Sequence, residues 1–197
     1  MLRVGVIGPE STGKSTVCRE LSERYGWCWV REYAREYVEA LNRPYTYDDV
    51  LLIAHRQINE LRNPFDTPSP ITDKSSQSAS PSDIVLYDTE LIITKVWMEH
   101  VFGRVAPEVK QAIEQQPMDM YLILAPDIAA EPDPVRENLD KREYFFQWYI
   151  REVEQTGRPY AIIKGEGEIR TERCAEKIKS ACCPLREERA LQLENKD

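Results

Sequence analysis

Residues 8–15 have the types and the spacing of a phosphate-binding loop. They read Gly8-Pro9-Glu10-Ser11-Thr12-Gly13-Lys14-Ser15 and match the pattern G-x-x-x-x-G-K-[ST] in full. Glycines lack a Cβ atom, so the backbone can curl until its amide groups point at an anion. Lys14 adds a cation for the β- and γ-phosphates, and Ser15 adds a hydroxyl for Mg²⁺. We therefore expect a nucleoside triphosphate to bind nine residues: Gly8, Pro9, Glu10, Ser11, Thr12, Gly13, Lys14, Ser15 and Thr16.

A carboxylate ends the apolar run over residues 84–88. Asp88 has the position from which an acidic residue at a strand end binds Mg²⁺ or its water molecules in phosphate-loop proteins. An aspartate is also a favoured cap of a following helix, and a helical pattern begins at Thr89. The two roles are compatible, and we predict Asp88 and Ser15 as the metal ligands.

A second set of polar residues follows the strand expected at 27–31. In an open parallel sheet, ligands bind beyond the carboxyl ends of the strands, which places Glu32 beside the phosphate loop and near Asp88. A carboxylate there could hydrogen-bond an acceptor hydroxyl or take its proton, and either Glu32 or Asp88 could be that base. Arg35 and Glu36 could instead belong to a solvated helix face with ion pairs.

An acidic segment over residues 127–142 is expected to act as a short lid. Arg136 and Arg142 lie in this segment and could close onto the β- and γ-phosphates, which would stabilise charge during phosphoryl transfer and exclude water. Arginines at a helix start can also be ordinary solvated charges.

Short apolar runs alternate with helical patterns along the chain, which predicts parallel strands joined by helices. The fold class is therefore α/β: a three-layer parallel-sheet P-loop NTPase resembling nucleoside and nucleotide kinases, with helices on both faces and a short lid. We expect strands at 3–7, 27–31, 84–88, 120–124 and 160–163. We expect helices at 14–25, 32–41, 47–62, 89–102, 107–115, 140–156 and 170–180.

Composition and charge indicate the number of domains, the segments that do not pack and the classes of partner that are excluded. With 197 residues and 42% hydrophobic residues, the chain can bury a core in one domain, expected over residues 1–183. Residues 63–83 are rich in serine and proline and are expected to form a flexible loop, and residues 184–197 a charged tail that frays or forms a solvated helix. The net charge of −8 argues against nucleic acids and anionic membranes as partners.

Other sequence features narrow the chemistry and the compartment. The guanine-reading N-K-x-D element is missing, which favours ATP, and neither G-x-G-x-x-G nor G-x-S-x-G is present. The five cysteines show no C-x-x-C spacing, and residues 1–7 do not resemble a secretion signal. We therefore expect a cytoplasmic protein with reduced thiols.

The motifs together resemble the ribosylnicotinamide kinase domain of NadR-type proteins, over about residues 3–180. The matching segments are residues 8–16, Glu32-Tyr33-Ala34-Arg35, His55-Arg56-Gln57, residues 88–94 and Pro134-Val135-Arg136-Glu137-Asn138. The resemblance implies a kinase that phosphorylates nicotinamide riboside with MgATP for NAD synthesis. It implies catalytic roles for Lys14, Asp88, Glu32, Arg136 and Arg142, and substrate contacts from Glu32, Tyr33, Arg35, His55 and Asp88.

Two alternatives remain open at this point. The acceptor could be another nucleoside-like molecule, or the chain could be a nucleotide-binding ATPase or regulatory switch that transfers phosphate to no small molecule. A homo-oligomer is also left open.

Overall fold

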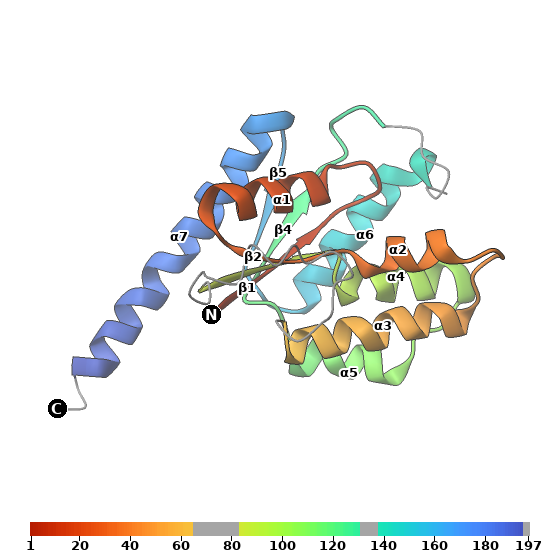
Figure 1. Cartoon of the computed structure of the whole chain (residues 1–197), viewed down its shortest axis with the longest axis horizontal. Helices are drawn as coiled ribbons and strands as arrows, with labels where there is room; N and C mark the ends of the chain where they lie inside the picture. Colours follow the sequence, from red (N-terminus) through yellow and green to blue (C-terminus); the bar gives the residue numbers. More distant parts are fainter. Residues whose placement is uncertain (65–82, 131–137, 195–197) are drawn as a thin grey trace.

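The computed structural model describes residues 1–64, 83–130 and 138–194, with side chains in the last helix described to residue 182. Its centre is a five-stranded parallel sheet in the order β2-β3-β1-β4-β5 (Figure 1). The strands are β1 (Leu2–Ile7), β2 (Cys28–Val30), β3 (Ile84–Asp88), β4 (Met120–Leu124) and β5 (Tyr160–Ile163). All four strand pairs are parallel, as predicted.

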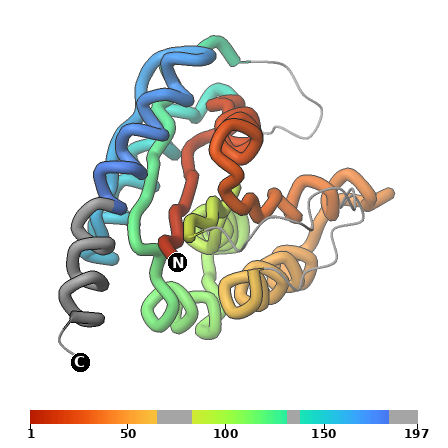
Figure 2. The backbone as a smooth tube through the Cα atoms, turned by 60° about the vertical axis from the view of Figure 1, so that its left-hand side comes forward, coloured from red at the N-terminus to blue at the C-terminus, as the bar shows by residue number. Residues whose placement is uncertain are grey.

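Helices cover both faces of this sheet. They are α1 (Lys14–Tyr25), α2 (Tyr33–Ala40), α3 (Tyr47–Arg62), α4 (Leu91–Phe102), α5 (Pro107–Gln115), α6 (Arg142–Gln155) and α7 (Gly167–Glu194), with a short 3₁₀ turn η2 at Leu139–Lys141. In Figure 2, the blue α7 and the orange α3 lie on opposite sides of the red β1. The predicted three-layer arrangement is confirmed.

Alternating strand side chains divide the core into two apolar clusters. Val4, Val6 and Leu122 are fully buried in the cluster that α1 and α7 cover. Tyr87 and Ile123 point to the other face, where α3, α4, α5 and α6 pack against them. Burial on both faces explains why these strands read as continuous apolar runs and not as alternating ones. This rigid frame brings the carboxyl ends of β1, β2 and β3 to one edge.

Two helices begin at other residues than the sequence predicts. Helix α4 begins at Leu91 and not at Thr89, because Thr89 has a φ of +65° and Glu90 is the N-cap. Helix α7 begins at Gly167, earlier than the expected residue 170. Its backbone continues as a helix to Glu194, which is one of the two forms expected for the charged tail. Residues 65–82 of the expected serine/proline loop and 131–137 of the expected lid lie outside the described residues. Within the part of the chain that the structure describes, no helix is both long and apolar enough to cross a membrane.

Candidate active site

The phosphate loop joins β1 to α1 and has backbone angles that its glycines permit. Gly8 has a φ of +152°, and a Cβ atom there would lie 2.7 Å from the carbonyl oxygen of Leu124. Gly13 is left-handed, with a φ of +79°, and is the N-cap of α1. The buried hydroxyl of Thr12 donates to the carbonyl of Pro9 at 2.9 Å and closes the loop on itself. The loop is therefore curled as the motif predicts.

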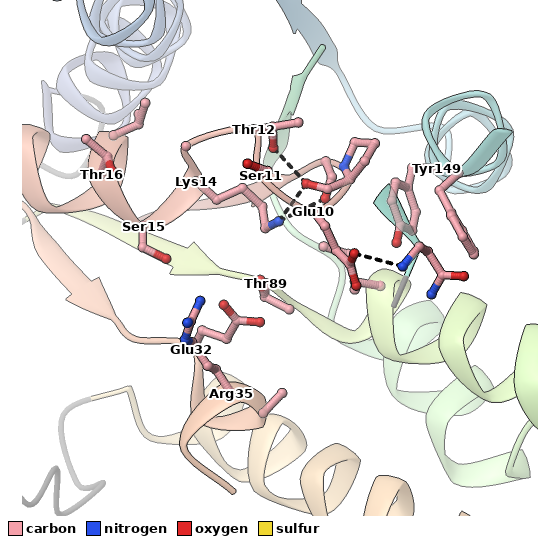
Figure 3. Close-up of a pocket in the computed structure, with 18 of the residues that line it drawn as sticks. Glu10, Ser11, Thr12, Lys14, Ser15, Thr16, Glu32, Arg35, Thr89 and Tyr149 are labelled. Carbon is pink, nitrogen blue, oxygen red and sulfur yellow. Dashed lines mark hydrogen bonds between the residues drawn. The ribbon is translucent and has the colours of Figure 1, made fainter. Parts of the chain in front are cut away.

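The side chain of Lys14 folds back over this loop. Its Nζ atom donates to the carbonyl oxygens of Gly8 and Pro9, each at 3.0 Å (Figure 3). These contacts keep the ammonium group at the mouth of the loop, where the outer phosphates of a bound nucleotide would meet it.

Asp88 lies at the end of β3 and is almost completely buried, with 1% of its surface exposed. Burial first, and then the negative charge of Glu32, raise the pKa of its carboxyl group to about 7. The Ser15 hydroxyl, the Lys14 ammonium and the Trp29 indole N–H favour the charged form and act in the opposite direction. The site thus holds a carboxyl group whose charge is poorly compensated.

The capping role considered for Asp88 belongs to Glu90 instead. The Oε1 atom of Glu90 accepts the amide of Ile92 at 2.9 Å, and Glu90 is the N-cap residue of α4. Neither oxygen of Asp88 has a well-aligned hydrogen-bond donor among the described residues. A buried carboxylate that lacks a well-aligned donor and lies beside the Ser15 hydroxyl fits Mg²⁺, which takes oxygen ligands and keeps several of its own water molecules. The described residues hold no cluster of three or more His, Cys, Asp or Glu ligands, so a metal here would rely on phosphate and water as well.

A cavity of about 510 Å³ opens in front of the phosphate loop, and residues 8–16 line it in full. Glu32 and Arg35 line it from the start of α2 (Figure 3). An aromatic wall completes this part of the cavity and consists of Tyr45, Trp97, His100, Phe145 and Tyr149. A second set of lining residues comes from the segment after β5 and from α7: Glu166, Gly167, Arg170 and Thr171. The cavity therefore reaches both sides of the phosphate loop.

The structure brings some predicted substrate residues to this cavity and places others elsewhere. Glu32 and Arg35 line it, although Arg35 also forms an exposed ion pair with Glu39 at 2.8 Å. Tyr33 is not among the lining residues, and its ring packs against Tyr37 and under the guanidinium of Arg56.

His55 lies outside this cavity, contrary to the role that the resemblance implied. Its Nε2 atom is 3.3 Å from the Glu108 carboxylate in a separate surface groove between α3 and α5. Two residues further along α3, the buried Gln57 donates to the carbonyl of Thr89 at 3.1 Å and accepts from the Thr94 hydroxyl at 2.7 Å. Gln57 therefore supports the unusual backbone at Thr89.

Arg142 does not point into the cavity as the lid prediction requires. It is buried at the first residue of α6, and its guanidinium donates to the carbonyls of Ile128 at 2.9 Å and of Ser11 at 3.1 Å. The bond to the main-chain oxygen of Ser11 makes Arg142 a support for the phosphate loop, and the bond to Ile128 ties it to the segment after β4. Arg136 lies outside the described residues.

Two features of the site escaped the sequence analysis. Arg170 contacts the phosphate loop although it belongs to no recognisable motif, and only its place after the last predicted strand could have drawn attention to it. The aromatic wall is assembled from α4, α6 and the α2–α3 connection, and spacing along the sequence does not reveal such a grouping.

A family model described as an AAA domain matches residues 3–170. A comparison with curated proteins found no match.

Solved structures give two kinds of similarity. A NadR protein in complex with NR is 25% identical, with a TM-score of 0.66 over 85% of this chain and 46% of that one. A NadR protein in complex with NAD and AMP-PNP is also 25% identical, with a TM-score of 0.63 over 85% of this chain and 45% of that one. The chain thus spans less than half the length of either NadR chain. Deoxyadenosine kinase from M. mycoides with bound dCTP is 13% identical, with a TM-score of 0.57 over 91% of this chain and 100% of that one, and shows the fold alone.

Proposed function

Because the chain belongs to the AAA domain family, whose phosphate loop implies nucleotide binding, we propose that it is an ATP-dependent phosphotransferase. It passes the γ-phosphate of MgATP to a hydroxyl group of a nucleoside-like acceptor, and that acceptor is nicotinamide riboside. The observation that carries this proposal is one cavity shared by the phosphate loop, an acidic residue at its mouth and an aromatic wall.

The donor half of the site follows from the loop itself. Backbone amides at the start of α1 bind the phosphates, and Lys14 neutralises charge on the outer two. Ser15 and Asp88 are the residues that would hold Mg²⁺, which when bound neutralises charge on the phosphates. The chain contributes position and charge, which supply most of the catalysis in phosphoryl transfer.

The acceptor half lies on the side of Glu32. Glu32 lines the cavity while Asp88 is buried beneath it, so we assign the contact with the acceptor hydroxyl to Glu32. The Glu32 carboxylate orients the attacking oxygen and takes its proton as the bond to phosphorus forms.

The combination of acidic and aromatic side chains supports a cationic ring in the acceptor. Glu10 and Glu32 line the same cavity as Tyr149. Burial raises the pKa of Tyr149, and the negative charges of these two acids add to the increase. The nicotinamide ring of the riboside is positively charged, and a cation over an aromatic face gains roughly 0.5–2 kcal/mol. The 25% identical NadR protein in complex with NR supports the same choice.

An acceptor screen tests the proposal directly. The protein is incubated with MgATP and, separately, with nicotinamide riboside, adenosine, deoxyadenosine, cytidine or deoxycytidine, and the products are identified by mass spectrometry. We expect ADP and nicotinamide mononucleotide only when nicotinamide riboside is present. A phosphorylated product from another nucleoside alone would replace the acceptor, whereas ADP formation that no acceptor stimulates would indicate an ATPase or a nucleotide-dependent switch.

A further inference from the structure

Among the described side chains, Arg170 is the largest that is fully buried, and it lines the cavity in front of the phosphate loop. We propose that Arg170 is a positioning residue that joins the phosphate loop to the segment of residues 164–167, so that nucleotide affinity depends on it. This inference rests on the proposed function in two respects: it takes the phosphate loop to bind MgATP, and it takes the acceptor to lie on the Glu32 side.

The first half of this connection is made to the phosphate loop and to the strand beside it. The Nη1 atom of Arg170 donates to the carbonyl of Thr12 at 2.6 Å, and Nη2 donates to the carbonyl of Ala125 at 3.2 Å. Thr12 belongs to the loop, and Ala125 directly follows β4. Both bonds are buried, so the arginine links Thr12 of the phosphate loop to the end of β4 in the sheet.

The second half is made to the segment that follows β5. The Nε atom of Arg170 donates to the carbonyl of Gly165 at 2.5 Å. Asp127 forms an ion pair with Arg170, and its other oxygen accepts the amide of Gly165 at 2.8 Å. Gly165 is therefore held at both its N–H and its C=O, in a left-handed conformation with a φ of +102°.

Burying a guanidinium group is costly, and this one is compensated on every side. Three main-chain carbonyls and one carboxylate accept from its three nitrogen atoms. An arginine has five N–H donors in a fixed plane, which suits simultaneous contacts in several directions. Replacing it leaves the carbonyls of Thr12 and Ala125 buried without their donor, so the loop must move or admit water.

Sheet order explains why this connection matters for the nucleotide. The phosphate loop follows β1, the central strand, whereas Glu32 follows β2 at one edge and residues 164–167 follow β5 at the other. With the acceptor on the Glu32 side, the base and ribose of the donor leave the phosphate loop towards β5. Glu166, Gly167 and Thr171 line the cavity on that side. Arg170 therefore fixes the phosphate loop, which binds the phosphates of MgATP, relative to residues 164–167, which lie on the side of its base and ribose. This lowers the entropy cost of ordering the two segments when the nucleotide binds.

The test compares binding of MgADP and of inorganic pyrophosphate, by calorimetry, in the wild type and in Arg170→Lys, Arg170→Met and Asp127→Asn variants. We expect both Arg170 variants to bind MgADP at least 10-fold more weakly and pyrophosphate at least 3-fold more weakly. Asp127→Asn loosens Gly165 but leaves the bond to Thr12, so it should weaken MgADP 3- to 10-fold and leave pyrophosphate within 2-fold. Lys177→Met is the matched control, because Lys177 is an exposed cation two turns after Arg170 in α7, beyond the phosphate loop and residues 164–167. Its affinities should stay within 2-fold.

Steady-state kinetics separate positioning from a general loss of structure. A positioning role raises the KM for ATP and leaves the KM for the acceptor within 2-fold, whereas partial unfolding lowers the active fraction and moves neither KM. A folded Arg170→Lys or Arg170→Met protein that binds MgADP as the wild type does would overturn the inference. If neither folds, unchanged MgADP affinity in Asp127→Asn has the same consequence. A wild-type protein that binds no MgADP would instead contradict the proposed function.

Discussion

Glu32 and Asp88 come from the ends of two neighbouring strands, and the negative charge of Glu32 contributes to the raised pKa of Asp88. Burial is the larger cause, and together they bring the pKa to about 7. Two carboxyl groups in adjacent positions thus have different environments: one lines the cavity and the other lies beneath it. Under the proposed function, the cavity-lining position suits Glu32 for proton transfer and the buried position suits Asp88 for the metal. The predictions for Asp88→Asn and Glu32→Gln follow from this difference.

Asp88→Asn should stabilise the protein above neutral pH. The folded protein holds the Asp88 proton up to about pH 7, whereas the unfolded chain releases it near 3.8, so stability falls as pH rises between these values. Removing the charge should raise the free energy of unfolding at pH 8 by roughly 2–4 kcal/mol and change it little at pH 4. Urea denaturation with EDTA and without nucleotide measures this, with the exposed Asp48→Asn as control.

The same substitution should lower turnover at least 100-fold while ATP affinity changes much less, because in the proposed function Asp88 holds the metal and the phosphate loop binds the nucleotide. Turnover at the wild-type rate would contradict the metal-binding role of Asp88. An unchanged pH dependence of stability would contradict its raised pKa.

Glu32→Gln should shift the titration of Asp88 to lower pH. Removing the neighbouring negative charge lowers the pKa of Asp88, so the carboxylate forms at a lower pH and Mg²⁺ binds there. The midpoint for Mg²⁺-dependent ADP binding, followed by calorimetry between pH 5 and 8, should fall by a few tenths of a pH unit or more. Glu36→Gln, an exposed change on the same helix, should leave the midpoint where it is. Equal midpoints in the wild type and Glu32→Gln would show that the two carboxyl groups do not interact.

Gly8→Ala should lower the free energy of unfolding more than Gly13→Ala does. A Cβ atom on Gly8 meets the Leu124 carbonyl at 2.7 Å, while one on Gly13 meets nothing within 4 Å, although both have a positive φ. Gly13→Ala should therefore cost only the left-handed conformation, about 1–2 kcal/mol of unfolding free energy. Gly8→Ala should cost more, because the backbone of the loop must also shift. Chemical denaturation of both variants measures the difference, and equal costs would contradict the close packing of Gly8 on β4.

Lys14→Ala should abolish phosphoryl transfer without unfolding the chain. The lysine contacts the main-chain oxygens of Gly8 and Pro9 at the mouth of the loop. Its removal also takes a positive charge from the neighbourhood of Asp88, which raises the pKa of that buried carboxyl group further, so Asp88 takes up a proton and the fold is kept. We expect turnover to fall at least 1,000-fold, since the charge that meets the transferred phosphate is lost. Circular dichroism and product formation are measured together, and Lys110→Ala on the exposed face of α5 is the control. Product formation at the wild-type rate would be incompatible with a catalytic role for Lys14.

Trp97→Leu should weaken acceptor binding selectively. The indole lines the cavity and packs edge-on against Tyr45, with ring centroids 4.9 Å apart. Loss of a ring contact should raise the KM for the acceptor roughly 10-fold, while the KM for ATP stays within 2-fold. Trp27→Leu changes an indole in the apolar cluster on the other face of the sheet, where it stacks on Tyr25 with ring centroids 4.8 Å apart, and it should affect neither constant. A rise in the KM for ATP alone would place the nucleotide base, not the acceptor, against Trp97.

The phosphate loop could be predicted in detail because its chemistry depends on consecutive residues. Gly8 and Gly13 set the backbone, Lys14 and Ser15 supply the charged and hydroxyl groups, and the loop is curled in the structure as the motif requires. The parallel sheet followed for a similar reason, since a strand buried on both faces is recognised from its own apolar side chains. The placement of Glu32 at the mouth of the loop required one further step, namely that strand ends meet at one edge of such a sheet.

Predictions that depended on side-chain direction were less successful. His55 faces Glu108 and not the cavity. Arg142 donates to main-chain carbonyls and does not point to the place where phosphates would lie. In both cases the residue lies on the predicted helix, but the rotation of that helix is set by its packing partners. A difference of one residue along a helix turns a side chain by about 100°.

Local patterns therefore established the chain as an α/β phosphate-loop protein, because backbone curvature and strand burial are encoded within a few neighbouring residues. Packing established the rest: Arg170 reaches Thr12 across 158 positions, and the aromatic wall combines side chains from three separate segments. Such contacts depend on strand order and on how helices lie against the sheet. No stretch of sequence contains that information, since each contact is formed by elements that meet only when the core is buried.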